Sequence, residues 1–307
     1  MTAFKKETVH NESAAQPTGS FAHILSSPLL VSIVIAVITL AVFIHVLSAD
    51  FVMWDDDKAI YNNPNIRDLD LGRIFTDVDS TMRYNPLTLL GWCIIYYLFK
   101  LNPFWFHFSN WLLHGLNASL VFLVIRRFLV LVLSNRYKAY VNPLRVTIAA
   151  GLASLLWSVH PLRVEPVAWC TDLTYCQALF FLLLSLQFYL LANDLGMGMR
   201  RHYLLLATSV IFYMISLLSH ALGMTFFLIL PVIDICLFVK PGSGDDRPRI
   251  SFPNRRMLLE KIPFAVAALA ISLVTIGIRM ASAGIWDKPV SLAEFGLFER
   301  FMQAMYI

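Results

Sequence analysis

The sequence is poor in charged residues. Aspartate, glutamate, lysine and arginine together make up 14% of its 307 residues, whereas an average globular chain carries about 25%. Hydrophobic residues account for 58% of the chain, and its mean hydropathy is +0.66. Several apolar runs approach the ~20 residues that a helix needs to cross a bilayer. The composition therefore excludes an ordinary soluble domain and predicts an all-α, polytopic membrane protein.

Other absences narrow the class of protein further. The sequence has no phosphate-binding loop, no dinucleotide motif, no zinc pattern and no internal repeat with a period of about 20–50 residues. No basic run is interleaved with aromatic residues, so we expect no nucleic-acid partner. The cysteines lack the spacing of metal ligands, and we interpret all four as apolar packing residues: Cys93, Cys170, Cys176 and Cys236.

The apolar runs predict about seven transmembrane helices. Lysine and arginine crowd the predicted inner loops, as they do in cytoplasmic loops generally, so we expect the amino terminus in the cytoplasm and the carboxyl terminus outside. A polar cytoplasmic tail at 1–27 precedes the membrane module at 28–282, and an outer tail at 283–307 follows it. We place the spans at 28–47, 105–125, 146–159, 173–192, 203–239 (a hairpin of two, broken at Ser219-His220) and 262–278.

The first outer loop, residues 49–104, carries the candidate chemistry. Asp55, Asp56 and Asp57 directly follow Trp54, an aromatic residue that we place at headgroup level. Adjacent carboxylates repel one another, so such a cluster suits a general base or a cation site. A hydrated polar loop is the alternative, because clustered carboxylates mark functional sites only probabilistically.

Two further segments of this loop are predicted to be juxtamembrane helices. Residues 66–75 alternate apolar and charged faces, as an amphipathic helix lying flat on the bilayer does. Residues 86–99 would form a helix of about 20 Å at 1.5 Å per residue. That length falls short of a hydrocarbon core of about 30 Å, so we expect this helix to remain on the outer side.

A polar stripe runs along the second predicted span. His107, Asn110, His114 and Asn117 recur at spacings of three, four and three, which places them on one face of a helix. Inside a membrane such a stripe faces a wet cavity or supplies interhelical hydrogen bonds, and both interpretations stay open. With Gln187, the first interpretation supports an alternative function as a polar-solute transporter or flippase-like protein.

Several blocks, in order along the chain, carry a resemblance to a known family. They are FVMWDD at 51–56, IYNNPNI at 60–66, Tyr84 with PLTLL at 86–90, LNPF at 101–104 with His107 and Asn110, LH at 113–114 with LNA at 116–118, and HPLRVEPVAW at 160–169. In these blocks the chain resembles the GT-C superfamily of membrane glycosyltransferases. More narrowly, it resembles the transmembrane proteins with tetratricopeptide repeats, whose animal members are protein O-mannosyltransferases; the repeats themselves are absent here.

The resemblance implies a fold of seven shared helices and an acidic residue of the first outer loop as catalytic base. It implies a polyprenyl- or dolichyl-phosphate sugar donor, bound from the membrane lipid, and a protein or glycan acceptor. We predict Asp56 as the base, with Asp55 next, in a single displacement that inverts the anomeric centre. Asp57 supports the base or, with Asp55, forms a site for a divalent cation; no cofactor is certain.

The leaving phosphate needs a cation, which arginine can supply in place of a metal. The nearest candidates on the outer side are Arg83, Arg163 and His160. For Arg163, a membrane-surface anchor or a partner for Glu165 is the alternative. Supporting roles are assigned to residues around the loop and the stripe: Asp57, Trp54, Glu165, His107 and His114.

The chain departs from the family pattern at three places. The family usually carries charged residues where Asn85, the segment Thr171 to Thr174 and His220-Ala221 stand here. Because these positions lie on the outer side, their loss makes an inactive GT-C-like scaffold a further alternative. For the membrane itself, the bacterial inner membrane is preferred over the endoplasmic reticulum.

Overall fold

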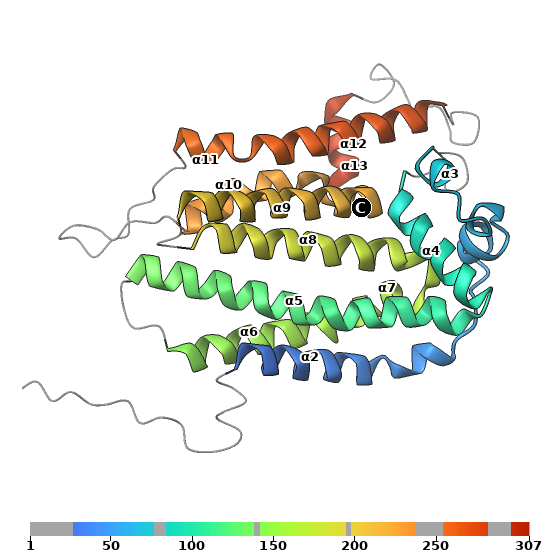
Figure 1. Cartoon of the computed structure of the whole chain (residues 1–307), viewed down its shortest axis with the longest axis horizontal. Coiled ribbons are helices and arrows are strands. Elements are labelled where there is room, and N and C mark those ends of the chain that lie inside the picture. The colour runs from blue at the N-terminus through green and yellow to red at the C-terminus, as the bar shows by residue number, and fades with distance from the viewer. Residues whose placement is uncertain are drawn as a thin grey trace, which may run out of the picture.

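The computed structural model describes residues 27–76, 84–137, 142–194, 198–237, 254–281 and 296–306. Every regular element in these ranges is a helix, so the predicted all-α class is confirmed. The long helices run side by side along the long axis of the molecule (Figure 1).

The centre of this bundle is α5 (Pro103–Tyr137), the longest helix described. It packs against α2 (Pro28–Val42) and α6 (Pro143–Ser158) on one side and against α8 (Leu173–Ala192) on the other. The row continues from α8 to α9 (Met199–Ser219) and from α9 to a further pair. That pair is α10 (Phe226–Leu237) and α12 (Ile262–Ala281), with the short α11 (Arg255–Leu259) before α12 and α13 (Leu297–Tyr306) near the end of the chain.

Four of the described helical segments are long and apolar enough to cross a membrane: Pro103–Ser134, Cys170–Ala192, Met199–Ser219 and Arg255–Ile278. Each of the other predicted spans coincides with a helix, but α2, α6 and α10 are shorter than this. The predicted count of seven spans is therefore not confirmed. The predicted break within 203–239 is confirmed, because α9 ends at Ser219 and a 3-10 turn, Ala221–Thr225, precedes α10.

Prolines and capping side chains fix where several helices begin. α2, α6 and α4 (Pro86–Phe99) each start with proline, whose fixed φ suits the first helical turn. The Asn142 side-chain oxygen accepts hydrogen bonds from the backbone N–H groups of Leu144 and Arg145, at 3.0 and 3.2 Å. These bonds satisfy donors that have no partner within the helix.

The described part of the loop at 49–104, predicted to be the first outer loop, folds onto one end of the bundle, where α3 (Leu71–Thr76) and α4 lie (Figure 1). Ile66 and Ile74 are buried there in a cluster with Trp92 of α4 and Phe106 of α5. The prediction of one continuous helix at 66–75 is wrong, whereas its position on the bilayer stays a prediction. The segment is a 3-10 turn, Pro64–Ile66, followed by the separate helix α3, and its isoleucines are buried by protein.

Hydroxyl groups link the helices inside the bundle. Thr39 of α2 donates to the Ser158 hydroxyl at 2.9 Å, and the Ser154 hydroxyl donates to the Ala118 carbonyl at 2.7 Å. Between α9 and α8, the Ser216 hydroxyl donates to the Ala178 carbonyl at 2.7 Å. Small polar residues of this kind allow close helix approach and bond across it, as in membrane helix packing generally.

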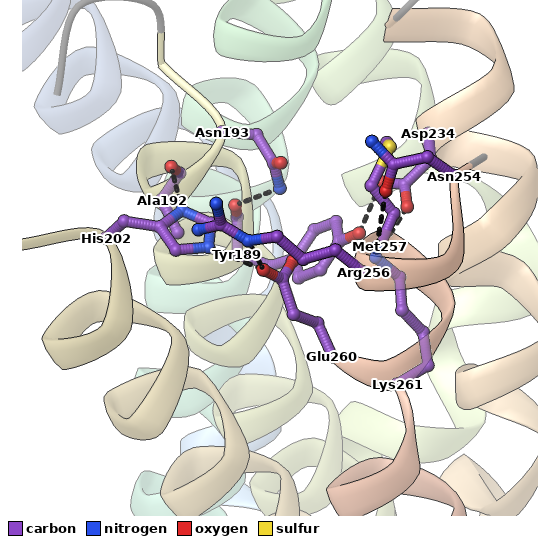
Figure 2. Close-up of polar contacts among 10 residues, drawn as sticks. All are labelled: Tyr189, Ala192, Asn193, His202, Asp234, Asn254, Arg256, Met257, Glu260 and Lys261. Atoms are coloured by element: carbon purple, nitrogen blue, oxygen red, sulfur yellow. Dashed lines mark hydrogen bonds and ion pairs between the residues drawn. The ribbon is translucent and has the colours of Figure 1, made fainter. Parts of the chain in front are cut away.

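A polar cluster closes the opposite end of the bundle, at α11 (Figure 2). Asp234, fully buried, forms a 2.5 Å ion pair with Lys261 and accepts a hydrogen bond from the Tyr189 hydroxyl. Nearby, His202 Nε2 lies 3.1 Å from a carboxylate oxygen of Glu260, and its Nδ1 lies 2.8 Å from the Ala192 carbonyl oxygen. The cluster joins α8, α9, α10 and the start of α12, so it fixes the last described span to the rest of the bundle.

Candidate active site

Asp56 anchors the first outer loop inside the protein. Its side chain is 0% exposed, and one carboxylate oxygen accepts the Val52 N–H at 3.0 Å. The other oxygen accepts two hydrogen bonds from Thr171, one from the backbone N–H at 2.9 Å and one from the hydroxyl. Thr171 belongs to a 3-10 turn, Cys170–Asp172, that leads directly into α8. The Asp56 carboxylate therefore connects the acidic loop, the segment that contains Asp55, Asp56 and Asp57, to the turn that begins α8.

A cavity of about 410 Å³ lies beside the hydrogen bonds between Asp56 and Thr171. Its charged lining comes from three segments: Asp55 from the acidic loop, Arg163 and Glu165 from the 160–169 segment, and Asp172 from the turn before α8. Thr171 itself is a lining residue. Ligand pockets run from roughly 300 to 1,000 Å³, so the volume suits a small polar ligand or the head of a larger one.

The buried part of the cavity wall comes from the bundle. α5 contributes His114 and Asn117, α6 contributes Trp157, and α8 contributes Thr174, Tyr175, Cys176 and Leu179. His114, Asn117, Thr174 and Cys176 are all at least nine-tenths buried. The lining therefore combines charged side chains from loops and turns with mostly uncharged side chains from α5, α6 and α8.

Arg163 is held at the cavity by an aromatic ring. Its guanidinium carbon lies 5.2 Å from the centroid of the Trp157 ring, a distance at which the ring face attracts a cation. Its Nε atom is buried and has no hydrogen-bond partner among the described residues. No ion pair joins Arg163 to Glu165 within the ranges that the structure covers. The guanidinium thus has hydrogen-bonding capacity left for a ligand.

Other predicted site residues lie elsewhere. Trp54 is 70% exposed, and Asp57 is absent from the cavity lining although one of its oxygens is buried without a partner. The His160 ring accepts the Leu162 N–H at 3.2 Å and so caps the turn that follows it. Arg83 falls outside the described residues.

The polar stripe of α5 bonds to main-chain carbonyls of other segments. His107 donates to Asp50 at 3.4 Å and His114 to Ser158 at 2.9 Å, while Asn110 donates to Trp169 at 2.6 Å and Asn117 to Cys176 at 2.9 Å. Two of these bonds join helices, from His114 to α6 and from Asn117 to α8, as one interpretation of the stripe predicts. Of the four residues, His114 and Asn117 also line the cavity.

The residues available for a metal ion are few. Within the described ranges, no three histidine, cysteine, aspartate or glutamate side chains lie close enough to hold an ion together. All four cysteines have free thiols, and Cys93, Cys170 and Cys176 are buried, in agreement with their interpretation as packing residues. A divalent cation between Asp55 and Asp57 stays a prediction.

Three lining residues of the cavity, Thr171, Trp157 and Tyr175, were not predicted as site residues from the sequence. Thr171 stood out only as a departure from the family pattern, yet it is the residue that holds Asp56. No spacing rule brings together two residues that are 115 positions apart. The sequence offered one indication of their proximity: Asp56 and Thr171 each lie close to the predicted outer end of a span, where the connecting loops are expected to meet.

The fold and the cavity define a class: a helical membrane module with a carboxylate- and arginine-lined pocket beneath its first outer loop. Comparisons with curated proteins narrow this class. The chain is 35% identical to protein O-mannosyl-transferase TMTC4 of Mus musculus over 179 residues, which cover 52% of the chain and 23% of that protein. It is 34% identical to the Homo sapiens protein of the same name over 180 residues, 52% of the chain and 24% of that protein.

Protein O-mannosyl-transferase TMTC2 of Mus musculus is 28% identical over 173 residues, which cover 53% of the chain and 19% of that protein. These matches confirm the resemblance that the sequence motifs indicated. The chain spans only about a fifth to a quarter of the length of these relatives. No family model matches the chain, and no solved structure does. All three relatives are mammalian, so the preference for a bacterial inner membrane has no support.

Proposed function

We propose that the chain is the membrane module of a GT-C-type glycosyltransferase, which moves a mannose-like hexose from a polyprenyl- or dolichyl-phosphate donor to a serine or threonine hydroxyl of a protein. The observation that carries the proposal is the cavity, because it brings a carboxylate, Asp55, and a guanidinium whose buried Nε has no partner among the described residues, Arg163, to one space at an end of an apolar bundle. The named relatives, which are O-mannosyl-transferases, support the reaction class.

The reaction needs a proton acceptor and a stabilised leaving group. The acceptor oxygen forms a bond to the anomeric carbon while the bond from that carbon to the phosphate oxygen breaks. The proton of the acceptor hydroxyl passes to a carboxylate, and the electron pair of the broken bond leaves on the lipid phosphate. Attack from the face opposite the phosphate inverts the anomeric centre, through an oxocarbenium-like transition state.

The geometry favours Asp55 over Asp56 as the proton acceptor. Asp55 lines the cavity, whereas both oxygens of Asp56 are already engaged by the backbone and by Thr171. Asp56 then acts as a positioning residue, because it is adjacent to Asp55 in the chain and is fixed to α8. Arg163 is placed to balance the charge on the departing phosphate, since a guanidinium can bond two phosphate oxygens at once.

The test is sugar transfer in membranes that hold the full chain, supplied with labelled polyprenyl-phosphate mannose and a serine- and threonine-containing peptide. Asp55→Asn should lower the rate by roughly 10²–10⁴-fold, the usual contribution of a general base. Asp68→Asn is the matched control, because Asp68 is an exposed carboxylate of the same loop that lies outside the cavity lining. Full transfer by a stably inserted Asp55→Asn variant, with transfer abolished in Asp56→Asn, would return the role of base to Asp56. No transfer by the unmodified chain, with the protein inserted and folded, would refute the enzyme.

A further inference from the structure

The lining of the cavity holds polar atoms that the protein leaves without partners. Among the described residues, Asn117 Oδ1, Trp169 Nε1 and Arg163 Nε are all buried and accept or donate no hydrogen bond. All three residues line the cavity. Burying an unpaired polar group costs about 1–3 kcal/mol, and native proteins contain few such groups. Three such atoms in the lining of one cavity indicate that a polar molecule binds there and supplies the missing hydrogen bonds.

Asn117 is the most informative of the three. It is 1% exposed, and its amide nitrogen is already committed to the Cys176 carbonyl at 2.9 Å. That bond fixes which end of the amide remains available: the oxygen, which can only accept a hydrogen bond. Cys176 lies in the first turn of α8, so Asn117 stands just inside the loop end of the bundle.

The side chains of α5 and α8 beside Asn117 in the lining, His114, Thr174, Cys176 and Leu179, include no carboxylate and no guanidinium. Charged groups are nevertheless close, because Arg163 covers Trp157, whose ring lies 5.6 Å from that of His114. A phosphate would be attracted to this guanidinium. The two uncharged atoms without partners, the acceptor Asn117 Oδ1 and the donor Trp169 Nε1, suit hydroxyl groups, which both donate and accept.

Trp169 adds an apolar surface to this lining. Of the three aromatic rings in the lining, Trp157 is covered by Arg163, and the Tyr175 ring lies 4.6 Å from that of His220. Binding pockets typically combine aromatic surface with a few polar groups that fix the orientation of the ligand. Trp169, whose backbone carbonyl is held by Asn110 at 2.6 Å, provides both.

We infer that Asn117 and Trp169 form a hydroxyl subsite that recognises the uncharged sugar ring of the donor, with Asn117 Oδ1 accepting a hydrogen bond from one ring hydroxyl. This inference rests on the proposed function for the identity of the ligand as a sugar. It makes Asn117 a specificity-determining residue: it selects which hexose is bound and takes no part in proton transfer.

The test measures binding separately from transfer. The purified full chain in lipid nanodiscs is titrated with short-chain polyprenyl-phosphate mannose and with its four monodeoxy analogues, which lack the 2-, 3-, 4- or 6-hydroxyl. The unmodified protein should bind one analogue roughly 10–100-fold more weakly than the parent sugar, as expected when a buried acceptor loses its donor. Asn117→Leu should bind that analogue and the parent equally, while the remaining analogues keep the order seen with the unmodified protein.

Gln187→Leu is the matched control. Gln187 lies on α8, and its side-chain oxygen is also buried without a partner among the described residues, but it does not line the cavity. It should retain the discrimination between the parent and the analogue. Equal discrimination by the Asn117→Leu and unmodified proteins would overturn the subsite even if transfer proceeds. Discrimination that depends on Asn117 without any transfer would leave the subsite standing and refute the enzyme. Failure of the unmodified protein to bind the parent sugar would overturn both.

Discussion

The hydrogen bonds between Asp56 and Thr171 allow us to predict how a substitution of Thr171 changes the free energy of unfolding and the rate of sugar transfer. Replacing Thr171 with valine removes the hydroxyl and preserves the shape of the side chain and the backbone N–H. One carboxylate oxygen of Asp56 then loses one of its two donors, while the other oxygen keeps the Val52 N–H. Hydrogen bonds to charged groups contribute about 1.5–3 kcal/mol, so we expect Thr171→Val to lower the free energy of unfolding by that amount.

The same substitution should reduce activity more than stability. Asp56 positions the neighbouring Asp55 at the cavity, and a displacement of a catalytic group by about 1 Å can cost on the order of 10²-fold in rate. Sugar transfer by Thr171→Val should therefore fall by about that factor, with the donor KM little changed. Unfolding is followed by denaturant titration in mixed micelles, and transfer is followed with the labelled donor.

Thr39→Val is the matched control for this prediction. Thr39 is also a fully buried threonine whose hydroxyl donates across helices, but its partner is the neutral Ser158 hydroxyl at 2.9 Å. Its loss should cost about 0.5–1.5 kcal/mol, as for an ordinary hydrogen bond, and leave transfer per folded molecule unchanged. If the two variants are equally active, the hydrogen bonds between Asp56 and Thr171 do not position Asp55, and the reasoning from Asp56 to the site fails.

Two further substitutions probe other parts of the structure. Lys261→Met leaves the buried Asp234 without its cation and should lower the free energy of unfolding by about 3–5 kcal/mol. Adding Asp234→Leu should recover most of that loss. Both variants are measured by denaturant titration, and equal losses in the single and double variants would contradict the ion pair. Arg163→Lys keeps the charge but loses the planar group over Trp157 and should raise the donor KM about tenfold, judged from the strength of a desolvated cation–π contact. Unchanged KM values in Arg163→Lys and Arg163→Ala would remove Arg163 from the phosphate site.

The helices could be predicted from the sequence because each depends on a local pattern. Apolar runs, prolines at helix starts and the break at Ser219-His220 all appear in the structure close to where they were expected. The number of spans could not be predicted equally well, because α2, α6 and α10 are shorter than a membrane-crossing helix of standard length. The 66–75 segment is not one helix, because a 3-10 turn ends at Ile66 and the helix α3 begins at Leu71. Ile66 and Ile74 are held apart from solvent by Trp92 and Phe106, a contact that the local pattern does not reveal.

The acidic loop was recognisable from sequence, but the roles of its members were not. Asp55 and Asp56 are neighbours of identical chemistry, and only the three-dimensional structure places one at a cavity and the other on Thr171. Arg163 was recognisable as the cation of an outer segment, whereas its position over Trp157 depends on how α6 and the following turn meet.

The two interpretations of the polar stripe turn out not to exclude each other. Every member donates to a main-chain carbonyl, which is the behaviour of a structural link. An asparagine side chain has a donor end and an acceptor end, however, and a link through nitrogen leaves the oxygen available. Asn110 and Asn117 are identical in this respect, and only Asn117 borders the cavity. What separates a packing residue from a ligand-binding one is therefore the space next to the unused atom, which spacing along a helix does not encode.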